Sequence, residues 1–147
     1  MSPKLQSRTK AKPIGFMSMS FLERTDFDAL AHRFKVQLFN SVVGHKNACL
    51  IATENQVKQS NLAIFNSLVH IGSSPPLLGV IFRPDSVERH TYENILETKS
   101  YTVNLISEKD IASAHQTSAR YPRTESEFKV TSLAAAYKDG FHAPYVE

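Results

Sequence analysis

Four short apolar runs in the middle of the chain constrain the fold most strongly. Three of them are continuous and bounded by polar or proline turns, as buried strands often are, and the fourth alternates between apolar and polar positions. The four runs are ACLIAT (48–53), LAIF (62–65), LLGVIF (77–82) and YTVNLI (101–106). They predict a fold built on short strands.

Helical spacing marks the segments around these strands. Apolar residues recur every three or four positions from Thr25, which predicts one helix ending near Asn40 with Thr25 as its N-cap. A short helix is expected over 91–98, capped by Thr91, and another over 108–117. Strands with interspersed helices indicate a mainly β fold, a β-barrel with added helices, or an α+β domain.

The charge of the chain is concentrated at its start. The sequence has 17 basic and 14 acidic residues, a net charge of +3. Residues 1–12 hold four of the basic residues and no acid, which leaves 13 basic against 14 acidic residues and a net charge of −1. We therefore expect a basic, disordered tail over 1–20, a single folded domain over 21–147 and no nucleic-acid partner.

Localisation signals and common catalytic motifs are missing from the sequence. The tail lacks the apolar segment of a secretion signal, and no run of about 18 apolar residues could span a membrane, so we expect a cytoplasmic protein without a membrane partner. The single Cys49 lies in a strand-like run and is predicted to be inert core. Nucleotide-loop, serine-hydrolase, HExxH and CxxC motifs are absent, and the six histidines follow no metal-site spacing, so no metal is expected.

Small polar and basic residues gather at the ends of the predicted strands. Arg83 ends the third apolar run, and Arg89, His90 and Thr91 surround the start of the next helix. Free N–H groups at a helix start, a hydroxyl and a guanidinium together suit a phosphate. The alternative is structural, with Thr91 only capping the helix and Arg83 only solvating a strand end.

Four sequence blocks, in order, resemble the flavin reductase-like family of FMN-binding split barrels. They are NLAIFNS (61–67), HIGSSPPLLGVIFRP (70–84), RHTYENI (89–95) and AHQTSARYPRTESEF (114–128). The resemblance implies a Greek-key split barrel, noncovalent FMN, and a homodimer with the flavins near the interface. Similar proteins continue past the APYV segment with further strands, so the last barrel strands are expected to be missing after Glu147.

The resemblance also assigns cofactor-binding residues. The polar edge of the isoalloxazine needs hydrogen-bond partners, and its phosphate needs charge. The residues expected to bind FMN are Thr53, Asn61, Ala63, Ile64, Phe65, Asn66, Ser67, Arg83, Arg89, His90, Thr91 and Ser118. No catalytic side chain is expected, because the flavin itself carries the redox change.

The predicted function is transfer of electrons from NAD(P)H through bound FMN to flavin or another small-molecule acceptor. One alternative is a flavin-binding protein without turnover, acting as an electron carrier. A nucleic-acid-binding barrel is a further alternative, and the net charge of −1 outside the tail argues against it.

Overall fold

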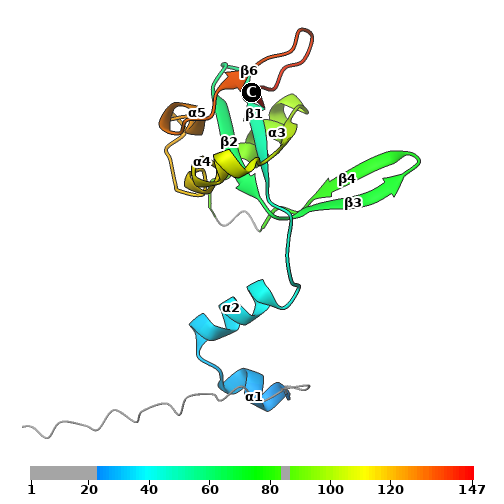
Figure 1. Ribbon diagram of the computed structural model, residues 1–147, viewed down its shortest axis with the longest axis vertical. Coiled ribbons are helices and arrows are strands. Elements are labelled where there is room, and N and C mark those ends of the chain that lie inside the picture. Colours follow the sequence, from blue (N-terminus) through cyan, green and yellow to red (C-terminus); the bar gives the residue numbers. More distant parts are fainter. Residues whose placement is uncertain (1–22, 84–86) are drawn as a thin grey trace, which may run out of the picture. The chain divides into compact units, whose positions relative to one another are not determined.

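The computed structural model describes residues 23–83 and 87–147, and the chain divides between Gly44 and His45 into two compact units (Figure 1). The first unit holds the helices α1 (Arg24–Ala29) and α2 (His32–Ser41). The expected basic tail over 1–20 lies outside the described residues.

The prediction of one continuous helix from Thr25 to Asn40 is wrong. Leu30 and Ala31 are extended and separate α1 from α2, and Glu23, not Thr25, occupies the N-cap position of α1. The break allows the two helices to pack on each other through an edge-to-face contact between Phe27 and Phe39, with ring centroids 5.4 Å apart.

The second unit is built on a three-stranded antiparallel sheet with the order β2-β1-β5. These strands confirm three of the four predicted ones, with ends shifted by one or two residues: β1 is Cys49–Glu54, β2 is Ser60–Phe65 and β5 is Thr102–Leu105. The remaining elements are β3 (Leu68–Ser73), β4 (Pro76–Val80), α3 (His90–Thr98), η1 (Glu108–Asp110), α4 (Ile111–Gln116), α5 (Glu127–Val130), β6 (Ala135–Ala136) and β7 (Tyr145–Val146).

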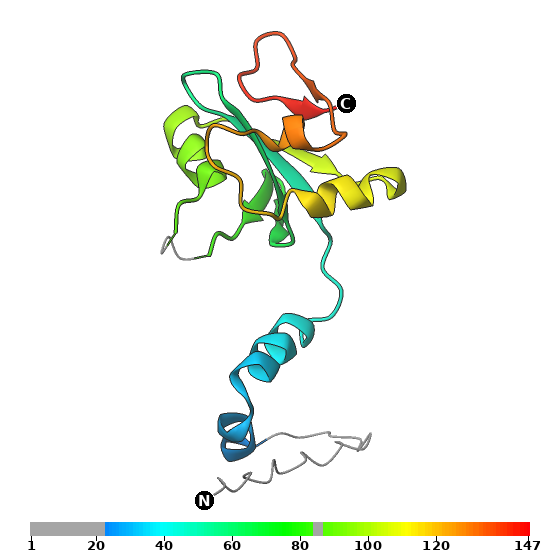
Figure 2. The ribbon, with the colours of Figure 1, turned by 90° about the vertical axis from the view of Figure 1, so that its left-hand side faces the viewer.

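Alternation along β1 and β2 gives the sheet two different faces. Leu50, Ala52 and Leu62 point to one face, where they form the core with Ala114 of α4 and Leu133. The other face carries the polar Thr53 and Asn61 beside the apolar Cys49, Ile51, Ala63 and Phe65. It is covered by α3, so α3 lies on one side of the sheet and α4 and α5 lie on the other (Figure 2). Cys49 is buried as predicted, and burial raises the pKa of its thiol.

The third predicted strand is not buried. β4 pairs with β3, which the sequence did not predict because His70, Gly72 and Ser73 interrupt its apolar pattern. The two strands form a separate hairpin that projects from the sheet (Figure 1). Its exposed apolar side chains include those of Val69, Ile71, Leu77 and Leu78.

Gly79 of β4 lies close to side chains of the neighbouring strand β3. A Cβ atom at Gly79 would lie 2.8 Å from Cδ1 of Ile71, too close without a shift. Cγ2 of Val69 would lie 3.2 Å away, so the close neighbours of Gly79 are side chains of β3. β4 begins at Pro76, and the first residue of a strand is a position that tolerates proline.

The described residues form three separate sheets, of three, two and two strands, and these do not close into a barrel. The helix predicted over 91–98 is α3, and the one predicted over 108–117 is η1 followed by α4. In the part of the chain that the structure describes, every helix is too short or too polar to cross a membrane.

Candidate functional site

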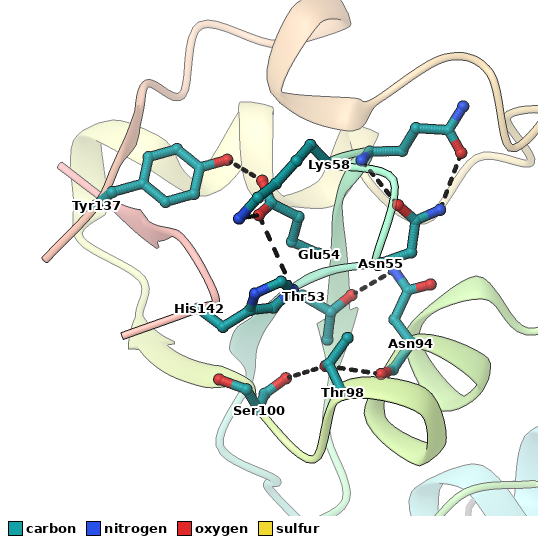
Figure 3. A network of polar contacts seen from close by, with 10 residues as sticks. Thr53, Glu54, Asn55, Lys58, Asn94, Thr98, Ser100, Tyr137 and His142 are labelled. Atoms are coloured by element: carbon teal, nitrogen blue, oxygen red, sulfur yellow. Dashed lines mark hydrogen bonds and ion pairs between the residues drawn. The ribbon is translucent and has the colours of Figure 1, made fainter. Parts of the chain in front are cut away.

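The start of α3 is attached to the sheet by two buried hydrogen bonds between side chains. Nδ2 of Asn61 donates to Oγ1 of Thr91 at 2.9 Å. Nδ2 of Asn94 donates to Oγ1 of Thr53 at 3.1 Å, a bond shown in Figure 3. Thr53 and Asn61 are direct partners in the β1–β2 pairing. All four residues are buried, so this polar pairing fixes where the first turn of α3 lies.

Thr91 does not cap α3, contrary to the sequence-based prediction. The helix begins at His90, and Arg89 at its N-cap position makes no side-chain capping bond. The carboxylate of Glu93 instead accepts the backbone N–H of Arg89 at 3.1 Å. Because Thr91 lies within the first turn, its hydroxyl points to the sheet and meets the Asn61 amide.

The expected phosphate-binding residues lie on both sides of an undescribed segment, residues 84–86. Arg83 is exposed just before that segment, and Arg89 and His90 are half-buried after it. Nε2 of His90 lies 3.8 Å from the carboxylate of Glu88. Thr91 and Asn61 are brought together directly, whereas Arg89 and His90 occupy the N-cap and first positions of α3.

A further basic residue at this helix was not singled out from the sequence. Nη1 of Arg123 donates to Oδ1 of Asn94 at 3.2 Å, and the same guanidinium forms an ion pair with Glu93. Arg123 also lines a small polar pocket with Asn61, His90 and Asn94. Arg123 lies in the 114–128 block, and the resemblance of that block to the family is the sequence signal that could have pointed to it.

The residues expected at the isoalloxazine edge fall at the end of β2 and in the turn to β3. Ala63 and Phe65 belong to the sheet face that carries Asn61, whereas Ile64 packs against the apolar core on the opposite face. Asn66 is exposed in the turn. Oγ of Ser67 donates to the carbonyl of Ile81 at 2.8 Å and so holds the base of the hairpin.

An aromatic row connects β2 to α3. Phe65 meets Phe82 edge to face with ring centroids 5.2 Å apart, and Phe82 lies 5.1 Å from Tyr92. Such rings provide apolar surface next to the polar pairs of Asn61 and Thr53. A site with apolar faces and a few polar groups is what a planar heterocycle requires.

Ser118 is separated from the other expected cofactor residues. It follows α4, which packs on the sheet face opposite to α3, and its hydroxyl donates to the carbonyl of His115 at 2.7 Å. The structure therefore brings Thr53, Asn61 and Thr91 together without Ser118.

Glu127 is a buried carboxylate that the sequence analysis did not single out. Its Oε2 accepts the backbone N–H of Leu62 at 2.9 Å, at the edge of β2 that pairs with no strand among the described residues. Burial raises the pKa of this carboxyl, and the Leu62 hydrogen bond and the nearby His90 oppose that rise. Glu127 thus provides an acceptor for a backbone N–H group at this edge of β2, the strand that carries Asn61.

A second polar network, centred on Glu54 at the end of β1, attaches the C-terminal segment (Figure 3). The hydroxyl of Tyr137 donates to Oε2 at 2.6 Å, and Nζ of Lys58 lies 2.9 Å from Oε1. Burial and the Glu54 carboxylate raise the pKa of Tyr137 to about 12. Within the described residues, no three His, Cys, Asp or Glu side chains gather as a metal site.

Comparison with known proteins identifies the fold around these residues. Residues 45–147 match the model of the flavin reductase like domain. The chain belongs to the flavin reductase-like family. This match covers the whole second unit, including α3, β2 and the Arg123 segment.

Several solved structures have a fold similar to that of the chain. A protein from Shewanella frigidimarina NCIMB 400, assigned as a flavin reductase with a split barrel domain, is 42% identical with a TM-score of 0.79 over 85% of this chain and 62% of that one. Nitrilotriacetate monooxygenase component B from Bacillus cereus is 18% identical, with a TM-score of 0.74 over 89% and 64% of the two chains. Flavoredoxin of Desulfovibrio vulgaris (Miyazaki F) is 22% identical, with a TM-score of 0.61 over 69% and 54%.

The three proteins of these solved structures are longer than the present chain. The chain spans 62%, 64% and 54% of the three, less than two thirds of each. The likeness to these structures therefore concerns only the part of each fold that this chain covers.

Proposed function

We propose that this protein binds FMN and transfers electrons from NAD(P)H through that flavin to a second flavin or another small acceptor. The observation that carries the proposal is the family match over residues 45–147, supported by the 42% identity to the Shewanella frigidimarina protein. When bound, the isoalloxazine supplies the hydride and electron chemistry. The residues of the chain then have to hold and orient it.

The arrangement of side chains fits a flavin at the α3 end of the sheet. The exposed Arg83 and the half-buried Arg89 supply positive charge, and the first-turn N–H groups of α3 supply donors for a phosphate. Thr91 orients the helix through Asn61, since its hydroxyl is turned inward. The end of β2 and Phe82 offer backbone groups and apolar surface to the ring.

Cofactor identity is the first test of the proposal. Purified full-length chain should be yellow, and heat should release FMN that is identified by chromatography. Arg83→Ala should weaken FMN binding by about 1.5 to 3 kcal/mol, the size of a charge-assisted contact. Release of FAD alone would contradict the FMN assignment, and a colourless protein that takes up no added flavin would contradict flavin binding.

The second candidate function is an electron carrier without NAD(P)H turnover. The fold likeness to flavoredoxin supports considering it, although at 22% identity this likeness concerns the fold alone. Stopped-flow mixing of the flavin-loaded protein with NADH or NADPH separates the two candidates. Bleaching of the flavin absorbance favours the reductase, whereas reduction only by dithionite or a redox partner favours the carrier.

We further propose that the protein acts as a homodimer. The β3–β4 hairpin leaves the apolar side chains of Ile71, Leu77 and Leu78 exposed in the single chain. Association could bury such a surface. Sedimentation over a dilution series, followed at protein and flavin wavelengths together, tests the dimer. A monomer with full flavin occupancy at every dilution would contradict it.

A further inference from the structure

Arg123 connects two residues of α3 that face different surroundings. Its guanidinium donates to Oδ1 of the buried Asn94 at 3.2 Å and pairs with the half-exposed Glu93. Asn94 is only 1% exposed and also donates to Thr53. The buried amide therefore holds Arg123 at one end, while the ion pair forms at the other.

Glu93 places a negative charge at the start of α3. Its carboxylate accepts the backbone N–H of Arg89, directly before the first helical residue. A carboxylate at this position interacts well with the helix dipole. The same charge opposes a phosphate that approaches the same helix end, unless a cation neutralises it.

Among the described residues, Arg123 supplies the guanidinium that forms an ion pair with Glu93. It reaches the helix from the segment between α4 and α5, 29 residues beyond Asn94 in sequence. Since Asn94 fixes one side of the guanidinium, the neutralising charge is held in place, which an exposed lysine would achieve less well.

On the basis of the proposed function, we propose that Arg123 is a positioning residue that makes this site selective for a phosphorylated flavin over riboflavin. It acts through Glu93, whose charge it cancels beside the phosphate. Riboflavin has the same isoalloxazine and ribityl chain but lacks the phosphate, so its affinity should be insensitive to this charge balance.

The test compares FMN with riboflavin on the same full-length variants by fluorescence titration. Arg123→Gln should raise the Kd for FMN by about fivefold, the size expected for one charge near a helix terminus, and leave the Kd for riboflavin unchanged. Adding Glu93→Gln to that variant should restore FMN affinity, because the uncompensated carboxylate is gone. Lys129→Ala removes an exposed positive charge from α5 and is the matched control, with no expected change.

Each remaining result decides the proposal. Equal weakening of FMN and riboflavin in Arg123→Gln, no change in either, or failure of Glu93→Gln to restore FMN would overturn it. If Arg123→Gln does not fold, Arg123→Lys, which keeps the charge, must keep most of the selectivity, and Glu93→Gln alone must not weaken FMN. A wild-type chain that binds neither flavin would instead overturn the proposed function, and this inference with it.

Discussion

The two faces of the β1–β2 pair use the same strands for opposite purposes. On one face, Leu50, Ala52 and Leu62 bury apolar surface against α4 and its neighbours. On the other face, Thr53 and Asn61 are equally buried but bond to side chains of α3. Burial of the apolar face stabilises the fold in proportion to the apolar surface removed from water, and this contribution does not depend on direction.

The polar face has the stricter geometry. Each buried polar group on it, such as those of Thr53 and Asn61, needs a partner at hydrogen-bond distance, and an unpaired one is costly. The apolar face can therefore hold the sheet together, whereas the polar face specifies the position of α3. This difference predicts which substitutions affect stability and which affect position.

The largest expected effect is on the apolar face. Leu62→Ala should lower the free energy of unfolding by about 2 to 5 kcal/mol, because Leu62 is fully buried and truncation leaves a cavity. Denaturant unfolding of the apo protein measures this loss. Leu105→Ala, at a site that is 87% exposed, is the control and should change stability by less than about 0.5 kcal/mol. Similar losses at both positions would remove the basis for placing the core on the Leu62 face.

A smaller loss is expected on the polar face. Asn94→Ala should cost about 1 to 3 kcal/mol, because it leaves the buried Thr53 hydroxyl without its donor. A double-mutant cycle with Thr53→Val should show that the two changes are not additive. Asn47→Ala, at an exposed position, serves as the control. Strict additivity in the cycle would mean that Thr53 and Asn94 do not interact as the structure shows.

The pH dependence of stability should reveal the buried Glu127. Its folded-state pKa is raised by burial, so its contribution is fully present below the ordinary pKa of 4.5 and is lost as pH rises through the raised value. Glu127→Gln keeps an oxygen acceptor for the Leu62 N–H and removes the charge. We expect this variant to lose part of the stability decrease between acidic and neutral pH in denaturant unfolding.

The exposed Glu125→Gln provides a control for this measurement. Its stability profile should follow that of the wild type. A Glu127→Gln profile identical to that of the wild type would show that the carboxyl of Glu127 does not titrate abnormally.

The smallest effect is spectroscopic. Ultraviolet titration of the five tyrosines should show one that ionises late, at a pKa of about 12, because burial and Glu54 disfavour the phenolate of Tyr137. The stability that the Tyr137 hydroxyl contributes is present below its ordinary pKa of 10.0 and is lost as pH rises through about 12. Tyr137→Phe should remove the late transition, and Tyr101→Phe should not. Persistence of the late transition in Tyr137→Phe would assign it to another residue.

Local patterns were sufficient to predict much of the secondary structure. The apolar runs predicted β1, β2 and β5, and the helical pattern predicted α3 close to its observed ends, although its expected cap, Thr91, lies inside the helix. The family blocks indicated the fold, because their residues and order are specific. The helix break at Leu30 was missed, since the apolar spacing continues across it although the backbone of Leu30 and Ala31 is extended.

The burial of LLGVIF was also mispredicted from the sequence. An apolar run indicates that a segment avoids water, but not which surface covers it. β4 has only β3 as a strand partner among the described residues, and several of its apolar side chains remain exposed. Burial depends on neighbours that are distant in sequence, so a local pattern cannot determine it.

The sequence by itself determined the short apolar runs that become β1 and β2. Because successive side chains of a strand point to opposite sides, Thr53 and Asn61 then lie on the face opposite to Leu62. Only the tertiary structure decided the partners of the polar face. Thr53 meets Asn94 across 41 residues and Asn61 meets Thr91 across 30. At the edge of β2, the backbone N–H of Leu62 likewise meets Glu127 across 65 residues. A hydrogen bond requires a particular distance and direction, and the chain meets that requirement only after the sheet and α3 have packed together.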